Sequence, residues 1–149
     1  MASIDTAGEA DIPQLCDLLA LLFAQEADFM PDRARQERGL RMILGDPRVG
    51  RILAAREDGR VVGMVNLLFT VSTAEGARVL LLEDMVVDPA HRGRGVGLAL
   101  VEAAIAFAAE QGCARITLLT DEDNASAQWF YGRAGFRRSA MVPMRRAIA

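Results

Sequence analysis

Apolar residues follow two different spacings along the chain, and these spacings predict helices and strands. Apolar side chains recur every three or four positions in residues 12–23, which is typical of an amphipathic helix. Similar patterns predict helices at 33–44, at 96–111 and between Asn124 and Gly135. Short apolar runs rich in β-branched residues predict strands. We place these strands at residues 3–7, 51–56, 61–70, 80–87 and 116–120, with one or two more within 136–148.

The order of these elements predicts the fold class. Residues 57–60 read as the turn of a hairpin, and a polar loop is expected at 26–32. Hairpins come first and are followed by strand, helix, strand, helix and strand, which is typical of a mixed sheet covered by helices on both faces. We therefore predict a protein of the α/β class, in the α+β form with a central mixed sheet and helices on both faces. Residues 1–149 are expected to form a single domain.

Residues 80–97 combine a strand, a loop of alternating glycine and arginine, and the start of a helix. Glycines let backbone amides approach a ligand closely, and the first amides of a helix have no partner within the helix. The helix dipole and the charges of Arg92 and Arg94 also favour an anion such as phosphate. The loop lacks Gly-Lys-Ser/Thr, and its glycines do not follow Gly-x-Gly-x-x-Gly, so neither common nucleotide-binding loop fits.

Two motifs give the chain a family resemblance. Arg92, Gly95 and Gly97 satisfy Arg/Gln-x-x-Gly-x-Gly/Ala, and residues 124–136 satisfy Asn-x-x-Ala-x-x-Phe-Tyr-x-x-x-Gly-Phe. In this order the motifs resemble those of the GCN5-related N-acetyltransferase (GNAT) family. The resemblance implies a GNAT-like acyl-CoA N-acyltransferase fold and acetyl-CoA as the acyl donor.

The resemblance also implies which residues hold the coenzyme. In the family the glycine-rich loop binds the pyrophosphate, and the preceding strand offers its backbone to the pantetheine arm and the thioester. The Asn and Tyr of the second motif are expected to contact the coenzyme; simple helix capping is the alternative for the Asn. The residues concerned here are Met85, Val86, Val87, Arg92, Gly93, Arg94, Gly95, Val96, Gly97, Asn124 and Tyr131.

Acetyl transfer to an amine needs a base, hydrogen-bond donors for the oxyanion and an acid for the departing thiolate. Glu83 and Asp84 are adjacent carboxylates in the apolar strand, where strict alternation would direct them to opposite faces. We expect Glu83 to be the base and Asp84 to form a structural ion pair with an arginine. The segment Leu-Glu-Asp-x-x-Val locally resembles the diamine and polyamine acetyltransferases, in which this glutamate serves the acceptor.

Tyr131 is the expected acid, because the resembled family has a tyrosine at this point that reaches the coenzyme sulfur. The alternative is ordinary packing, since Tyr131 belongs to a helical stripe of apolar residues. His91 is read as a surface histidine without a catalytic role.

These residues predict an N-acetyltransferase that acts on a primary amine by direct attack, with a small-molecule amine as the favoured acceptor. The alternatives are a protein lysine or N-terminal acetyltransferase, and a non-catalytic acyl-CoA-binding regulatory domain. Acceptor choice in the resembled family usually depends on the first two helices and the hairpin loops, here residues 26–45 and 71–78.

Composition narrows the remaining classes. The net charge is −3, which gives no basic field for nucleic acid. The chain has one histidine and two cysteines without metal spacing, so we expect no metal and two buried thiols. We find no signal peptide and no apolar run long enough for a bilayer, and so expect a cytoplasmic protein that does not bind membranes. The resemblance also suggests a homodimer, because many members of the family are dimers.

Overall fold

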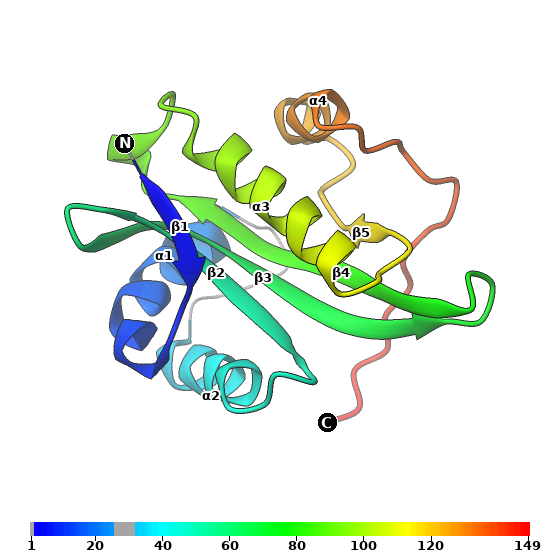
Figure 1. Ribbon diagram of the computed structural model, residues 1–149, viewed down its shortest axis with the longest axis horizontal. Coiled ribbons are helices and arrows are strands. Elements are labelled where there is room, and N and C mark those ends of the chain that lie inside the picture. The colour runs from blue at the N-terminus through cyan, green and yellow to red at the C-terminus, as the bar shows by residue number, and fades with distance from the viewer. Residues whose placement is uncertain (1, 26–31) are drawn as a thin grey trace. The chain divides into compact units, whose positions relative to one another are not determined.

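The computed structural model describes residues 2–25 and 32–149 (Figure 1). They divide into two compact units, Met1–Leu119 and Thr120–Ala149. Most of the polar loop expected at 26–32 lies outside the described residues.

The first unit contains a five-stranded mixed sheet with the order β1-β2-β3-β4-β5. Neighbouring strands are antiparallel except β4 and β5, which are parallel, so the expected mixed sheet is confirmed. The elements are β1 (Ser3–Thr6), the 3₁₀ turn η1 (Glu9–Asp11), α1 (Ile12–Gln25), α2 (Arg33–Leu44), β2 (Gly50–Glu57), β3 (Arg60–Ser72), β4 (Ala77–Val87), the 3₁₀ turn η2 (Pro89–His91), α3 (Val96–Glu110) and β5 (Ile116–Leu118).

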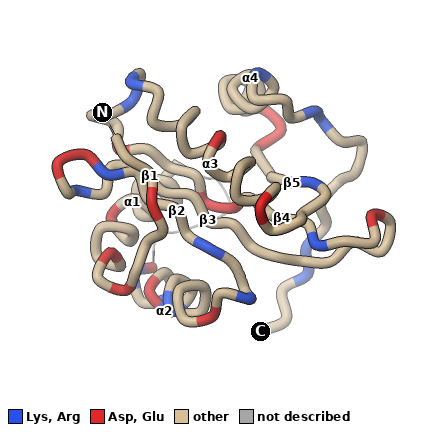
Figure 2. Tube along the Cα trace, in the orientation of Figure 1, with Lys and Arg blue, Asp and Glu red and all other residues tan. Residues whose placement is uncertain are grey.

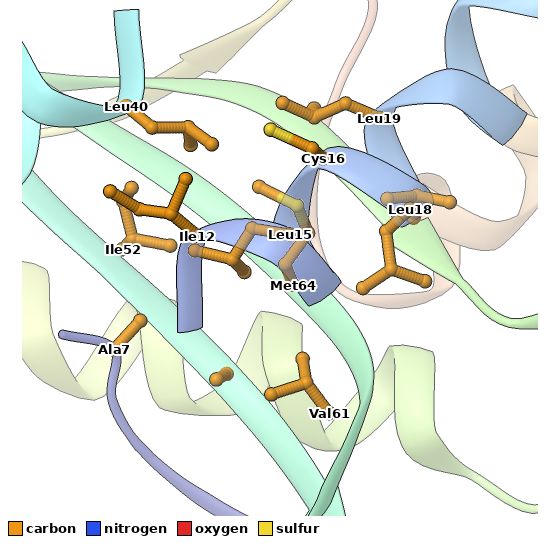
Figure 3. Close-up of a cluster of buried hydrophobic side chains, with 12 residues drawn as sticks. Ala7, Ile12, Leu15, Cys16, Leu18, Leu19, Leu40, Ile52, Val61 and Met64 are labelled. Carbon is orange, nitrogen blue, oxygen red and sulfur yellow. The ribbon is translucent and has the colours of Figure 1, made fainter. Parts of the chain in front are cut away.

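Two apolar cores lie on opposite faces of this sheet. Side chains from α1 and α2 pack on one face, around Leu15, Leu40, Ile52 and Met64 (Figure 3). Side chains from α3 pack on the other face. Successive residues of β2 alternate between the two cores, as the pleat of a strand requires. The sheet therefore needs apolar residues on both faces, which explains the continuous apolar run of β4 before Glu83.

A β-bulge interrupts the pairing of β3 with β4. Between the opposed pairs Asn66–Glu83 and Met64–Val86, β3 has one residue and β4 has two. The backbone of Asp84 takes a φ of 42° at this point, a left-handed conformation that is rare outside glycine. Bulges of this kind redirect side chains and are frequent next to active sites.

The second unit contains one helix, α4 (Ala125–Arg133), which begins at its cap Asn124. The prediction of one or two strands within 136–148 is wrong, because the described residues after α4 form no strand. Met141, Val142, Met144 and Ile148 are exposed there. Pro143 cannot donate a hydrogen bond to a strand ladder, and arginines at 137, 138, 145 and 146 break the apolar run.

Charged residues of both signs are interspersed along the chain, as the colours of Figure 2 show. Among the described residues, no helix is both long enough and apolar enough to cross a membrane. The same residues contain no group of histidine, cysteine, aspartate and glutamate side chains that could hold a metal ion. Cys16 is buried and Cys113 is half-buried, and both are free thiols.

Candidate active site

The bulge brings the two carboxylates of β4 to the same side of the sheet. Glu83 lies opposite Asn66, and directly opposed residues of an antiparallel pair share a face. Asp84 accepts a 2.7 Å hydrogen bond at Oδ2 from Nδ2 of the same Asn66. The expectation of opposite faces is therefore wrong, since it assumed regular alternation and the bulge adds one residue. Glu83 is exposed, whereas Asp84 is half-buried.

Asp84 lies in a low-polarity environment with an amide partner rather than an arginine. Burial raises the pKa of its carboxyl group, and the hydrogen bond from Asn66 partly opposes this rise. No arginine of the described residues forms an ion pair with Asp84, so the structural pair expected from the sequence is not present. A buried carboxylate without a cation is costly and marks a place where a ligand would be stabilised.

Asp84 lines a cavity of about 290 Å³ between the sheet and helices α1 and α2. Its polar lining comes from α2 and its cap and from β3 and β4, and its apolar lining comes from α1 and α2. The lining residues are Leu19, Phe23, Asp32, Arg35, Gln36, Gly39, Leu40, Ile43, Asn66 and Asp84.

Beyond the bulge, one edge of β4 is left without a strand partner in the described residues. The parallel pairing of β4 with β5 covers only Leu80–Leu82. Met85 and Val87 pack toward α3, and Val86 is in the core beneath α1 and α2. The segment 83–87 can therefore offer backbone groups along this edge.

The glycine-rich loop then leads into α3 with the expected geometry. Gly93 and Gly95 have φ values of 78° and 80°, a region that glycine enters without a steric penalty. Gly95 caps α3 without a side-chain hydrogen bond, and the first helical bond runs from the amide of Ala99 to the carbonyl of Gly95. The amides of Val96, Gly97 and residue 98 thus have no partner within the helix.

A glutamate side chain and a backbone carbonyl hold the two arginines of this loop. Nη1 of Arg94 lies 3.1 Å from Oε1 of Glu57 at the end of β2. Nε of Arg92 donates to the carbonyl of Val87 at 3.4 Å. His91, read from the sequence as a surface residue, is half-buried and lies 3.9 Å from Oε2 of Glu57. The loop is thereby fixed to the end of the sheet.

The second unit places Tyr131 within a small aromatic cluster. The ring centroid of Tyr131 lies 5.2 Å from that of Phe130 and 5.7 Å from that of Phe136, both edge to face. Burial raises the pKa of Tyr131 to about 12, so its phenol remains protonated at neutral pH. Oδ1 of Asn124 accepts a 3.1 Å hydrogen bond from the amide of Ala127, which is the capping role left open by the sequence.

Two cavity residues, Gln36 and Asn66, were not identified from the sequence. Asn66 lies in the long apolar run of β3, where an isolated amide was a usable signal. Gln36 lies on α2, and the many arginines of this helix are typical of an exposed segment. Both side chains are buried.

Comparison with known proteins places these features in a family. Residues 12–136 match the family described as the acetyltransferase (GNAT) family. Glucosamine 6-phosphate N-acetyltransferase from Trypanosoma brucei brucei is 32% identical over 90 residues, which are 60% of this chain and 59% of that protein. An uncharacterized N-acetyltransferase of Mycobacterium bovis is 36% identical over 94 residues, 63% of this chain and 56% of that protein. These alignments thus span somewhat more than half of each relative's length.

A solved structure shows the same fold over nearly the whole chain. It is an integron cassette protein from the mobile metagenome of Cole Harbour Salt Marsh, with a TM-score of 0.85 and 28% sequence identity. The likeness covers 98% of this chain and 90% of that protein. The expected GNAT-like fold is confirmed.

Proposed function

Because the chain belongs to the acetyltransferase (GNAT) family, we propose that it transfers the acetyl group of acetyl-CoA, the donor that the family uses, to the primary amine of a small molecule. One observation carries this proposal. The bulge of β4, with its two carboxylates, is followed within the same unit by the glycine-rich loop. The first amides of the helix after this loop have no partner within the helix. The groups proposed to bind a cationic amine and those proposed to bind a phosphate thus come from one strand and from the loop and helix after it.

The loop supplies what a coenzyme pyrophosphate requires. The amides at 96–98 lie at the positive end of the α3 dipole, where an anion is stabilised. Arg92 and Arg94 add two full positive charges. We assign Gly93, Gly95, Val96 and Gly97 to the same cradle, and Met85, Val86 and Val87 to the backbone edge that would align the pantetheine arm. Asn124 completes the assignment by its place in the second motif.

Glu83 is the proposed base for direct attack. An amine arrives as an ammonium ion and must lose a proton before its nitrogen can attack the thioester carbonyl. The Glu83 carboxylate would take this proton, directly or through water. The nitrogen then bonds to the carbonyl carbon and loses its second proton to solvent, and the tetrahedral intermediate breaks its C–S bond, expels the CoA thiolate and leaves the amide product.

Tyr131 is the proposed acid. The phenol would donate its proton to the departing thiolate, and its pKa of about 12 keeps that proton in place at neutral pH. The family match runs through residue 136 and so includes Tyr131. Because the match also crosses the boundary between the two units, we propose that residues 1–149 act as one N-acetyltransferase domain.

A small-molecule acceptor is favoured by the cavity beneath α1 and α2. Its volume of about 290 Å³ is close to the lower end for small-ligand sites, and its lining mixes apolar side chains with a few polar groups. The trypanosomal relative is named for an amino sugar phosphate, which is also a small primary amine. A protein lysine or N-terminal acetyltransferase, and a binding domain without turnover, are the competing functions.

The proposal is tested by the release of free CoA. The purified full chain is incubated with acetyl-CoA and a panel of amino alcohols, alkylamines, diamines, amino acids, aminoglycosides and lysine peptides, and thiol is measured. We expect transfer to at least one small amine that exceeds transfer to every peptide. Preference for a peptide would instead support a protein acetyltransferase. Calorimetric binding of acetyl-CoA without transfer to any amine would support the binding domain.

A further inference from the structure

Two buried polar atoms on the wall of the cavity have no hydrogen-bond partner among the described residues. They are Nε2 of Gln36, on α2, and Oδ1 of Asn66, on β3. Only 8% of Gln36 and 3% of Asn66 is exposed. Buried polar groups in folded proteins are nearly always paired, because an unpaired group loses its hydration without compensation. Two such atoms in one cavity therefore indicate what a ligand would supply.

The chemical character of these atoms is complementary. The amide of Asn66 is oriented by its bond to Asp84, because only Nδ2 can donate to a carboxylate. Oδ1 of Asn66 can therefore only accept a hydrogen bond, and Nε2 of Gln36 can only donate one. Asp84 adds a carboxylate to the same wall. The cavity thus offers a donor, an acceptor and an anion.

The rest of the lining is mostly apolar, apart from the charged side chains of Asp32 and Arg35. Leu19, Phe23, Leu40 and Ile43 line the cavity from α1 and α2. Such apolar walls suit a short carbon chain, with polar groups recognised only where the polar side chains of the lining lie.

We propose that the acceptor is a small aliphatic amine that carries a hydroxyl group, an amino alcohol, with its carbon chain in this cavity. This inference rests on the proposed acetyl transfer, because it names the substrate of that reaction. A hydroxyl group has both a donor and lone pairs, so it can accept a hydrogen bond from Gln36 or donate one to Asn66. The charged amine is attracted by the carboxylate of Asp84. An alkylamine offers no acceptor to Gln36. A diamine, which the local resemblance around Glu83 suggested, carries two ammonium groups that donate only.

The test is a binding measurement on the full chain loaded with CoA, which requires no turnover. Three matched series of two to six carbons are titrated and followed by ligand-observed NMR: amino alcohols, alkylamines and diamines. We expect one amino alcohol to bind at least about tenfold more tightly than the alkylamine and the diamine of equal length, since each lacks a hydrogen bond made in a buried site. Equal or weaker binding of every amino alcohol overturns the inference.

Two variants link this preference to the cavity. Gln36→Leu removes the buried donor with little change in volume, and we expect it to reduce the preference for the amino alcohol to about twofold or less. Gln14→Leu is the matched control, because Oε1 of Gln14 already accepts a 2.8 Å hydrogen bond from the amide of Val61. This control, compared at a temperature where both variants are folded by circular dichroism, should keep the tenfold preference. A preference that survives in Gln36→Leu contradicts the inference.

Release of CoA, measured on the same three series, separates this inference from the proposed function. Equal transfer to alkylamines and amino alcohols would support the proposed acetyl transfer but overturn the inference that the acceptor is an amino alcohol. Selective binding of amino alcohols without CoA release from acetyl-CoA would overturn the transfer reaction, while the preference of the cavity would stand.

Discussion

The two faces of the sheet provide binding groups in different ways. On the face covered by α3, the core is apolar and the proposed anion site at its end consists of backbone amides. On the face covered by α1 and α2, a similar apolar core opens into a cavity with Asp84, Asn66 and Gln36 on its wall. The first site depends on backbone conformation, and the second depends on the identity of individual side chains.

This difference fits the two ligands of an acetyltransferase. A donor common to a whole family can be held by groups that every residue carries, so glycines at the right positions are sufficient. An acceptor that differs between members must be recognised by side chains. The bulge of β4 lies between the two proposed sites. It places Asp84 on the same side of the sheet as Glu83, which faces α1 and α2, and the strand then continues into the glycine-rich loop.

The largest effect should come from Glu83→Gln, which tests the acceptor face. We expect kcat to fall about a hundredfold or more, as is usual when a general base is removed. The loss should be greatest at low pH, where the amine is most fully protonated. The affinity for acetyl-CoA, measured by calorimetry, should stay within about twofold. Glu102→Gln on the exposed surface of α3 is the control; wild-type turnover in Glu83→Gln would remove this residue as the base.

Gly95→Val tests the backbone-built site. Valine at a φ of 80° is strained by about 1–3 kcal/mol, and relief of this strain would move the amides that begin α3. We expect acetyl-CoA to bind about tenfold more weakly in calorimetric titrations.

A matched control for this strain is Gly59→Val, in the turn between β2 and β3. Gly59 has a φ of 77°, and a side chain there, as at Gly95, would meet no other atom within 4 Å. Both variants should lose similar stability in urea, and only Gly95→Val should lose coenzyme affinity. An equal loss of affinity in both would show that the effect is general destabilisation.

Asp84→Asn tests whether the acceptor cavity is maintained at a cost in stability. The folded carboxyl has a pKa raised by burial above its ordinary value of 3.8, so the folded chain holds a proton that the unfolded chain has released. The free energy of unfolding therefore falls as the pH rises from about 3.8 through the folded pKa. Asparagine keeps an acceptor for Asn66 and removes this charge. We expect Tm at pH 8 to rise by roughly 2–4 °C, as ~1 kcal/mol would produce in a chain of this size, and KM for the amine to rise several-fold.

The difference in Tm between Asp84→Asn and the wild type should shrink as the pH falls through the folded pKa and should disappear well below pH 3.8, where the wild-type carboxyl is protonated in both states. Asp58→Asn is the control, since Asp58 also has a positive φ, of 52°, but is exposed. Its Tm at pH 8 should stay close to that of the wild type. A lower Tm for Asp84→Asn at pH 8 would mean that the Asp84 charge is stabilised within the folded chain.

The contrast between the two faces also explains what could be predicted from the sequence. The glycine-rich loop is encoded by neighbouring residues, so the start of α3 directly after Gly95 was predicted correctly. The coenzyme contacts of this loop stay a prediction. The cavity is assembled from residues as distant as Gln36 and Asn66, and only the fold brings them together.

The bulge could not be predicted from the sequence for a further reason. The strand has apolar residues on both faces. The extra residue, which changes the order of the two faces after Glu83, therefore leaves no mark on the hydrophobic pattern. The final strands were predicted from apolar content alone, although Pro143 and its neighbouring arginines do not show the alternation of a strand. Local elements such as the loop and the start of α3 were thus predictable, and the register of the strands was not.

The smallest effect should come from the ion pair between Arg94 and Glu57, which tests how much side chains add to the backbone-built site. Arg94 is more than half exposed, so the pair should contribute at most about 1 kcal/mol to stability. The positive charge of Arg94 would nevertheless interact with both Glu57 and the proposed phosphate. Arg94→Gln should weaken acetyl-CoA binding about two- to threefold, whereas Glu57→Gln should strengthen it slightly by releasing the guanidinium. Calorimetry at low and high salt should show both effects shrinking as salt screens the charges. Changes in the same direction for both variants would mean that the pair acts by holding the loop in place, and that the amides of α3 depend on this support.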